Sequence, residues 1–444
     1  MYLKKTSLLF SYSNTKIPAR CAGMRFKSLC TILPFLTIIV MTISSCTTTE
    51  KKETTGDADS TSTGFEKGTF GYDLDFLKQH DSVIILKSND EKAQIIVSPK
   101  YQAKVFTSTA NGNEGLSFGW VNYKAFTGAE DAHMNAYGGE NRLWLGPEGG
   151  RFSLFFKPGD SMVFDHWKTP AAFDTETWKV TAQTDKSVTM KKDMQLTNYH
   201  NTQLNLSVTR SVDILNDDEI KAGTGLSMDS SVKVVAYQTI NTLTNTGKDA
   251  WTESTGMPCI WILDMMKNTP STVIVVPYKN AAGAKFEDVA TTNYFGEISA
   301  DRLKHDDNKL LFKADGKSRG KLGIKPKYAK PVIGSYDAEN KVLTIAMFEP
   351  DASAKYLNQE WNITKPSFSG DAVNAYNDGP LADGSQMGPF YEIESVSPAA
   401  FLKSNQSIVH KQAVYHFTGD EKALDAISQK ILGVTLNEVQ TAFK

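Results

Sequence analysis

The sequence predicts an all-β protein: a large antiparallel β-sandwich with short helices near its ends. Short runs of β-branched and apolar residues recur at roughly 8–15-residue spacing over about 380 residues, as they do in sandwiches. Turn-forming residues, such as Asn245, Thr246 and Gly247, separate these runs. Long helical periodicities are scarce, so we expect strands to form most of the fold.

The folded part is expected to extend as a single domain over residues 65–444, beginning with a short helix around 73–78. The strand pattern is clearest in residues 204–215, where Leu204, Leu206 and Val208 alternate with polar residues. Two polar stretches, 279–308 and 370–388, predict long loops. Strands are expected at 83–86, 94–97, 103–108, 116–123, 142–145, 152–156, 178–184, 187–192, 194–198, 204–215, 232–244, 260–265, 272–277, 310–312, 321–324, 332–336, 342–348, 390–396 and 407–417.

The end of the chain predicts two helices. Thr418 and Glu421 fit a capping box before an apolar periodic run, and Gly433 is a natural stop. Thr435 and Glu438 fit a second box before a short final helix.

Composition excludes some classes of partner and site. The chain has 444 residues with 48 basic and 50 acidic side chains, giving a net charge of −2. This balance argues against a nucleic-acid partner, which normally requires a basic surface. Three of the four cysteines lie at or before residue 46, so only Cys259 remains in the folded part. An internal disulfide or a cysteine-based zinc site is therefore excluded there.

Residues 24–46 have the pattern of an export signal, within a predicted signal segment 1–46. Arg25 and Lys27 precede an apolar stretch of about 15 residues, which is short for a membrane-spanning helix of roughly 20. The stretch ends in Ile43-Ser44-Ser45-Cys46, which resembles a bacterial lipobox with Cys46 as the lipidated residue. Residues 1–23 would then be an upstream extension, and the alternative is an uncleaved membrane anchor.

Residues 47–64 contain no large apolar side chain, which predicts a flexible tether. The tether would hold the folded part away from a membrane. The composition resembles that of Bacteroidetes lipoproteins, which implies a protein lipid-anchored to the bacterial outer membrane, in the periplasm or at the cell surface.

A glycine-rich stretch at residues 135–156 is the main candidate for a binding site. Two glycine pairs flank a short strand and let the backbone turn sharply or approach a ligand. Carboxylate and guanidinium groups bind hydroxyls, and an indole ring covers the face of a pyranose. We therefore expect Glu140, Arg142, Trp144 and Glu148 to bind a carbohydrate. The alternative is a structural ion-pair network.

Glu392 and Glu394 are the candidate catalytic residues. They lie two apart on a predicted strand, so both side chains share one face about 6.6 Å apart. Two carboxylates at this spacing can divide acid and base roles, because like charges separate their pKa values. The alternative is the solvent-facing side of a half-buried strand.

Histidines and a polar loop offer weaker candidates. His133 and His166 flank the glycine-rich stretch and are the better site candidates among the histidines; the alternative is that they are ordinary polar loop residues. No histidine pair has a helix-borne zinc spacing, so no metal is expected on that basis. Calcium is conceivable at the oxygen ligands of one loop, but their spacing does not match an EF-hand. Those loop residues are Asp371, Asn374, Asn377, Asp378 and Asp383. Cys259, in an apolar setting, is expected to be a buried hydrophobe.

Three stretches resemble the galactose mutarotase-like (β-supersandwich) proteins, from about residue 65 to the end. They are YQTINTLTNTGKDAW at 237–251, FYEIESVSPAAFLKSNQSIVHKQAVYHF at 390–417, and the Gly/Arg/Trp stretch. The resemblance implies a supersandwich fold and, as in aldose 1-epimerases, Glu394 as base with Glu392 beside it. The family's histidines are missing, and Glu148 or His133 is the nearest substitute for the early one. This departure puts standard mutarotation in doubt.

These observations lead to three hypotheses. The first is a membrane-anchored lipoprotein that binds or processes carbohydrate, without a required cofactor. The second is an active sugar epimerase that uses Glu394 as base. The third is a structural or interaction lipoprotein whose polar cluster only supports the fold. For the first two, we expect the Gly/Arg/Trp stretch and the Glu392–Glu394 strand to form opposite walls of one hollow.

Overall fold

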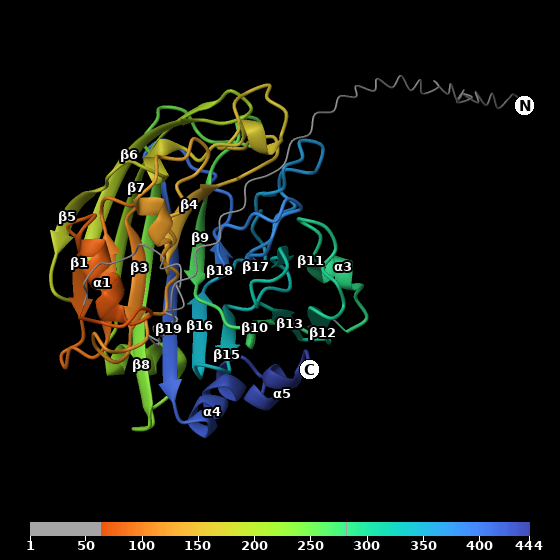
Figure 1. Ribbon diagram of the computed structural model, residues 1–444. Helices are drawn as coiled ribbons and strands as arrows, with labels where there is room; N and C mark the ends of the chain where they lie inside the picture. The colour runs from red at the N-terminus through yellow and green to blue at the C-terminus, as the bar shows by residue number, and fades with distance from the viewer. Residues whose placement is uncertain (1–63, 281) are drawn as a thin grey trace, which may run out of the picture. The chain divides into compact units, whose positions relative to one another are not determined.

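The computed structural model describes residues 64–280 and 282–444, so the predictions for the signal segment, Cys46 and nearly all of the tether lie outside the described residues. In the described part, the strands form antiparallel sheets of ten, six and three strands (Figure 1). The two larger sheets share one apolar core, to which Val208 of the first and Ile393 of the second both contribute. The large antiparallel sandwich expected from the sequence is confirmed.

The ten-stranded sheet forms the larger layer. In β7 (Gln203–Ile214), Leu204, Leu206 and Val208 face the core as predicted, and the next inward position is the fully buried Arg210. In spatial order its strands are β12 (Leu303–His305), β13 (Lys309–Lys313), β10 (Thr272–Pro277), β15 (Val332–Asp337), β16 (Val342–Phe348), β19 (Ser407–Gly419), β8 (Val232–Asn245), β7 (Gln203–Ile214), β6 (Ser187–Thr197) and β5 (Lys179–Gln183).

The six-stranded sheet carries the candidate residues Arg142, Trp144, Glu392 and Glu394. Its order is β11 (Ala290–Thr291), β14 (Gly320–Ile324), β17 (Val373–Asn377), β18 (Tyr391–Val396), β9 (Cys259–Met266) and β4 (Arg142–Gly146). Two of the predicted loops therefore contain strands: β11 and β12 lie within 279–308, and β17 lies within 370–388. Residues 373–377 pair with β14 and β18, so tertiary pairing overrides their polar composition.

A three-stranded sheet and the first helix form a separate apolar cluster. The sheet consists of β1 (Ile84–Lys87), β2 (Gln94–Ser98) and β3 (Lys104–Thr109). Helix α1 (Phe70–Lys78) begins at Thr69, whose side chain accepts a hydrogen bond from the Tyr72 backbone. Phe70 and Leu77 of the helix pack with Ile96 and Phe106 of the sheet.

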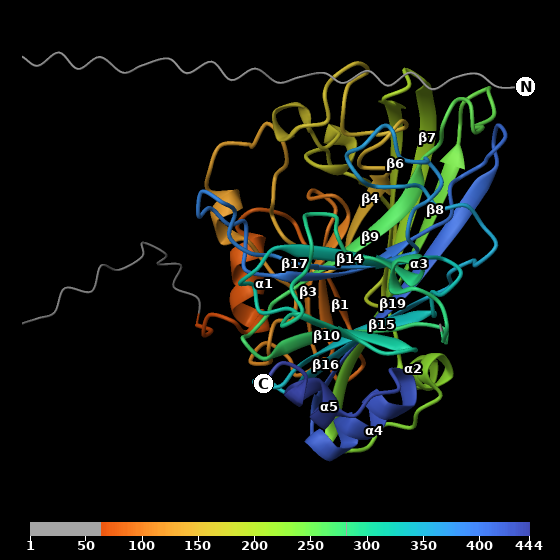
Figure 2. The same ribbon diagram turned by 90° about the vertical axis from the view of Figure 1, so that its right-hand side faces the viewer.

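The two C-terminal helices cover the other face of the ten-stranded sheet (Figure 2). Helix α4 (Glu421–Ile431) is capped by Asp420, which accepts from the Ala423 backbone at 3.0 Å, rather than by the expected Thr418. Helix α5 (Leu436–Thr441) is capped by Thr435 as predicted, with the Glu438 amide at 3.1 Å.

Short helices also lie between strands. Helix α2 (Asp217–Thr224) begins with a capping box formed by Asn216 and Glu219. Helix α3 (Phe286–Val289) is a single turn, and 3₁₀ turns occur at η1 (Tyr123–Phe126), η2 (Phe164–His166) and η3 (Ala171–Phe173). Over the described residues, no helix combines the length and apolar character that crossing a bilayer requires.

The glycine pairs of the central stretch bring it close to other backbone segments, rather than to the open side of the cavity described below. Gly138 has a φ of +82°, and a Cβ there would lie 2.2 Å from the Trp120 carbonyl oxygen. A Cβ on Gly149 would lie 2.3 Å from the Glu360 carbonyl oxygen. These contacts fix both ends of the stretch that carries Arg142, Trp144 and Glu148.

Candidate functional site

A cavity of about 310 Å³ lies over the face of the six-stranded sheet that is opposite to Leu143, Ile262 and Ile393. Its volume is at the lower end of the roughly 300–1,000 Å³ typical of small-ligand sites. The cavity is lined by Asp131, His133, Met134, Ala136, Arg142, Trp144, Glu148, Phe164, Trp167, Trp261, Leu263, Met265, Phe295, Arg319, Lys321, Trp361, Tyr376, Met387, Phe390 and Glu392.

Strand register explains the floor of this cavity. Residues directly opposite on paired strands point to the same side of a sheet. Trp144 is opposite Trp261, and Glu392 is opposite Met265 on one side and Tyr376 on the other. Lys321 lies opposite Tyr376 on the next strand, so its side chain points to the same side of the sheet. Five strands of one sheet therefore build the floor, and the expectation of two opposite walls is not what the structure shows.

Glu392 reaches the cavity and forms an ion pair with Arg142. The Arg142 Nη2 atom donates to Glu392 Oε1 at 3.0 Å, and both side chains are almost fully buried. The guanidinium also lies over the Trp144 ring, 4.3 Å from its centroid. Burial raises the pKa of Glu392 to about 7, against the attraction of Arg142 and with the added repulsion of Glu394. The Glu392 carboxyl therefore exchanges its proton near neutral pH.

Glu394 points to the same side of the sheet as Glu392, but it is fully buried under the Trp261 and Lys321 side chains that bond to it and does not line the cavity. Its Oε2 atom accepts hydrogen bonds from Lys321 Nζ at 2.9 Å and Trp261 Nε1 at 2.8 Å. The Lys321 ammonium is 4.5 Å from the centroid of the Trp261 ring. Glu394 thus positions two residues that do face the cavity, while Glu392 is the late-strand carboxylate that a ligand can reach.

Glu148 is a second carboxylate in the cavity. Its backbone amide donates to Gln359 Oε1 at 2.7 Å, which ties the end of the glycine-rich stretch to residues 358–361. Burial raises the pKa of Glu148, while the nearby Lys321 charge and a hydrogen bond with Trp361 lower it. Glu148 and Glu392 therefore both hold protons more strongly than an exposed glutamate does.

Four tryptophans line the cavity: Trp144 and Trp261 lie in its floor, and Trp167 and Trp361 are on loops. Trp144 and Trp261 meet edge to face with centroids 5.7 Å apart, and Trp167 and Trp361 are stacked at 6.0 Å. Phe164, 60% exposed, extends this wall to the rim. Flat rings at several angles suit a ligand with apolar faces and polar edges.

Several buried polar atoms at this cavity have no hydrogen-bond partner among the described residues. They include the indole nitrogens of Trp144 and Trp167 and the Nε atom of Arg142. Glu394 Oε1, just below the floor, is also without one. These atoms have almost no accessible surface, so they lie behind the cavity wall and a ligand reaches them only if the side chains move.

Of the two candidate histidines, only His133 lines the cavity. Its Nδ1 atom is 2.6 Å from the Trp167 carbonyl oxygen, and its ring stacks on Phe164 with centroids 4.5 Å apart. His166 lies outside the cavity, where its Nδ1 atom contacts Ser161.

Glu140 is separated from the cavity and lies in the interior. Its Oε1 atom accepts from Ser108 at 2.7 Å and is 2.9 Å from His416 Nε2. Both Glu140 and His416 are fully buried. For Glu140, the alternative stated above, a structural polar network, describes the geometry.

Lys321 and Arg319 line the cavity but were not singled out from the sequence. Lys321 interrupts the apolar run of its strand, which is a signal for a buried paired charge. Arg319, Trp167 and Trp361 are contributed by loops, where no periodicity indicates which way a side chain points.

The oxygen ligands considered for calcium are held by other partners. Asn377 donates to the Ser318 carbonyl at 2.8 Å, and Asp371 accepts from the Tyr294 hydroxyl at 2.7 Å. In the residues with described positions, no group of three or more His, Cys, Asp or Glu side chains is arranged to hold a metal ion. Cys259 is fully buried, and burial raises its thiol pKa to about 12, as in a structural cysteine.

The fold and cavity define a β-sandwich protein with a ligand-sized, aromatic-walled pocket on one sheet that holds both acidic and basic side chains. The chain belongs to a family of unknown function, DUF6786, whose profile matches residues 68–443. No curated protein matches the sequence.

Solved structures with a similar arrangement include a candidate aldose 1-epimerase from Escherichia coli K12. It is 9% identical with a TM-score of 0.47, and the match covers 76% of this chain and 99% of that one. A galactose mutarotase-like protein from Lactobacillus casei is 8% identical, with a TM-score of 0.46 and coverage of 76% and 100%. A galactose mutarotase-related enzyme from Lactobacillus acidophilus is 8% identical, with a TM-score of 0.41 and coverage of 75% and 97%.

Proposed function

We propose that the cavity over the six-stranded sheet binds a saccharide. The observation that carries this proposal is the combination of aromatic walls and ionisable groups in one ligand-sized cavity. Four tryptophans line it beside the Arg142–Glu392 pair, Glu148 and Lys321. A sugar offers hydroxyls along its edge and C–H groups on its faces, so it bonds to the polar groups while it packs on the rings.

The same cavity supports proton transfer to a bound sugar, and we propose anomer exchange as the candidate reaction. In that reaction a base takes the proton of the anomeric hydroxyl while an acid protonates the ring oxygen, and the bond between C1 and the ring oxygen breaks. Ring closure on the other face returns both protons. Glu392 is the better base because it reaches the cavity and has a pKa of about 7. Glu148 is the candidate acid, since burial raises its pKa.

Binding is tested with Trp144→Phe, which replaces the indole with a smaller aromatic ring. We expect about three- to tenfold weaker binding to the best ligand on a glycan array, because part of an aromatic contact worth about 0.5–1.5 kcal/mol is lost. Trp251→Phe is the matched control, because Trp251 is also buried but does not line the cavity. Equal affinity in wild type and Trp144→Phe would show that Trp144 does not contribute to ligand binding.

The location of the protein is a separate proposal. We propose that Cys46 is lipidated and that residues 47–64 tether the sandwich to the bacterial outer membrane, in the periplasm or at the surface. Cys46→Ser is expected to abolish incorporation of labelled fatty acid in cells and to release the protein from the membrane fraction. Cys30→Ser, within the same apolar segment, is the control and should leave both unchanged. Labelling that persists in Cys46→Ser would contradict the anchor.

A further inference from the structure

Arg319 stands apart from the other cations of the cavity. Arg142 is paired with Glu392, and Lys321 with Glu394. Arg319 also lines the cavity, yet it forms no ion pair with any carboxylate in the described part of the chain. A guanidinium without an anionic partner at a ligand site is available to an anionic ligand.

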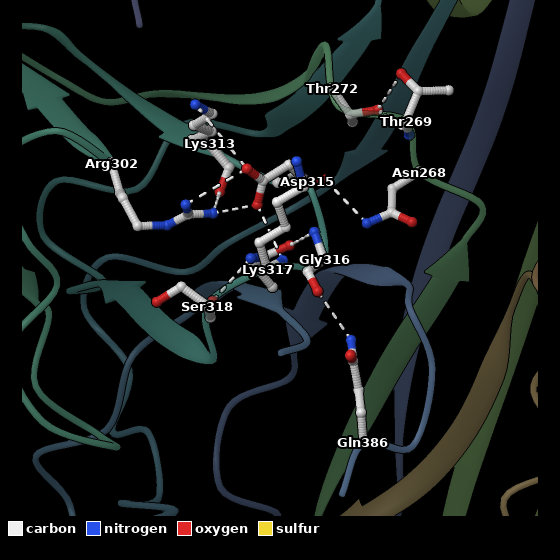
Figure 3. A network of polar contacts seen from close by, with 12 residues as sticks. Asn268, Thr269, Thr272, Arg302, Lys313, Asp315, Gly316, Lys317, Ser318 and Gln386 are labelled. Atoms are coloured by element: carbon white, nitrogen blue, oxygen red, sulfur yellow. Dashed lines mark hydrogen bonds and ion pairs between the residues drawn. The ribbon is translucent and has the colours of Figure 1, made fainter. Parts of the chain in front are cut away.

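The turn that presents Arg319 is braced on both sides. Asp315, just after β13, forms a buried ion pair with Arg302 and accepts from the Lys317 amide at 3.0 Å (Figure 3). The Gly316 carbonyl accepts from Gln386 Nε2 at 2.9 Å, which connects the turn to the loop that carries Met387 (Figure 3). The chain is therefore fixed three residues before Arg319.

The guanidinium itself is also held in place. Its Nε–H donates to the Tyr376 hydroxyl at 3.3 Å, and that hydroxyl donates to Asp378 Oδ1 at 3.0 Å. One face of the guanidinium lies on the Phe295 ring, 3.8 Å from the centroid. The Nε edge and one face are thus occupied, while the two terminal nitrogens have no hydrogen-bond partner among the described residues. Those two nitrogens form a planar fork that matches a carboxylate.

We propose that the ligand is an acidic sugar, a uronic acid or a saccharide ending in one, whose carboxylate is bound by the terminal nitrogens of Arg319. This inference rests on the proposed saccharide site and specifies its substrate class. The sugar ring occupies the tryptophan-lined space, and the carboxylate lies at the rim beside Phe295. Arg142 and Lys321 keep their ion pairs with Glu392 and Glu394.

The test compares sugars that differ only in the acid group. Galacturonate and galactose, and glucuronate and glucose, are titrated into the purified full-length protein at pH 7 and low salt, with binding measured by calorimetry or NMR. Wild type is expected to bind at least one acid about 10-fold or more tightly than its neutral partner. Arg319→Gln should remove this preference and change the affinity for the neutral sugar by less than about twofold. Arg319→Lys should keep only part of the preference, because lysine has no planar fork.

The control is Arg151→Gln, at an exposed arginine outside the cavity, which should leave the preference intact. Equal affinity for acid and neutral sugars, or equal weakening of both in Arg319→Gln, overturns the inference while the saccharide site stands. Galactose 6-phosphate is a third arm: tight binding of the phosphate without preference for either uronate also overturns it. If none of these sugars binds and Trp144→Phe changes nothing on the glycan array, the proposed function itself fails.

Discussion

Replacing Glu392 with glutamine is expected to slow anomer exchange of the bound sugar by about 10²- to 10⁴-fold, the usual contribution of a positioned base. Burial raises the pKa of Glu392 to about 7, so the group is mostly protonated below that pH and mostly ionised above it. A base must be ionised to accept a proton. The wild-type rate should therefore rise as Glu392 ionises through about pH 7 and fall again once Glu148, the proposed acid, loses its proton, as NMR of anomer exchange can show.

Glu394→Gln tests which of the two carboxylates of β18 (Tyr391–Val396) acts as the base. Glu394 is bonded to Lys321 and Trp261 beneath the floor, so its replacement should disturb binding but keep the rise in rate through pH 7. Glu392→Gln should flatten that rise. A flat profile in Glu394→Gln with a normal one in Glu392→Gln would make Glu394 the base. If the wild type does not accelerate anomer exchange, the protein binds a sugar without catalysing this reaction.

The largest loss of stability is expected from Arg210→Met. The fully buried guanidinium donates to the Ala103 carbonyl at 2.8 Å, to Asn241 Oδ1 at 2.6 Å and to the Asn141 carbonyl at 3.2 Å. Methionine fills a similar volume but leaves these acceptors without a donor. We expect the free energy of unfolding to fall by about 3–5 kcal/mol, because each buried acceptor left without a donor costs about 1–3 kcal/mol. Urea denaturation followed by tryptophan fluorescence measures it.

Arg151→Met is the matched control for that substitution. Arg151 is exposed, and its guanidinium lies 5.4 Å from the Phe152 ring centroid. Its replacement should change the free energy of unfolding by no more than about 0.5 kcal/mol. Comparable losses in both variants would show that the interior hydrogen bonds of Arg210 contribute little.

Much of the fold was predictable because strands leave a local pattern. Alternation identified β7 (Gln203–Ile214), and β-branched runs identified most of the others. Polar strands were missed: residues 373–377 form a central strand whose asparagines bond to neighbouring backbone and side chains. Sequence composition cannot show that pairing, because the partners are distant in the chain.

The candidate site was partly visible in the sequence. Residue spacing correctly put Glu392 and Glu394 on one strand face, but not which of them reaches the cavity. That difference depends on Lys321, which is more than 70 residues away and holds Glu394 below the floor. Glu140 was grouped with Arg142 by proximity, yet the two lie in different environments, because a sharp glycine turn immediately precedes Glu140.

Mutations in the floor of the cavity and mutations at its rim are expected to have different effects. Its floor belongs to a continuous sheet, whose reverse side is packed into the main core, so a change there disturbs folding as well as chemistry. Its rim is made by Phe164, Phe295 and Met387, each exposed and each on a different loop. Substitutions at these three positions can therefore reshape the rim of the cavity while Glu148 and Glu392, the proposed proton-transfer groups, stay unchanged.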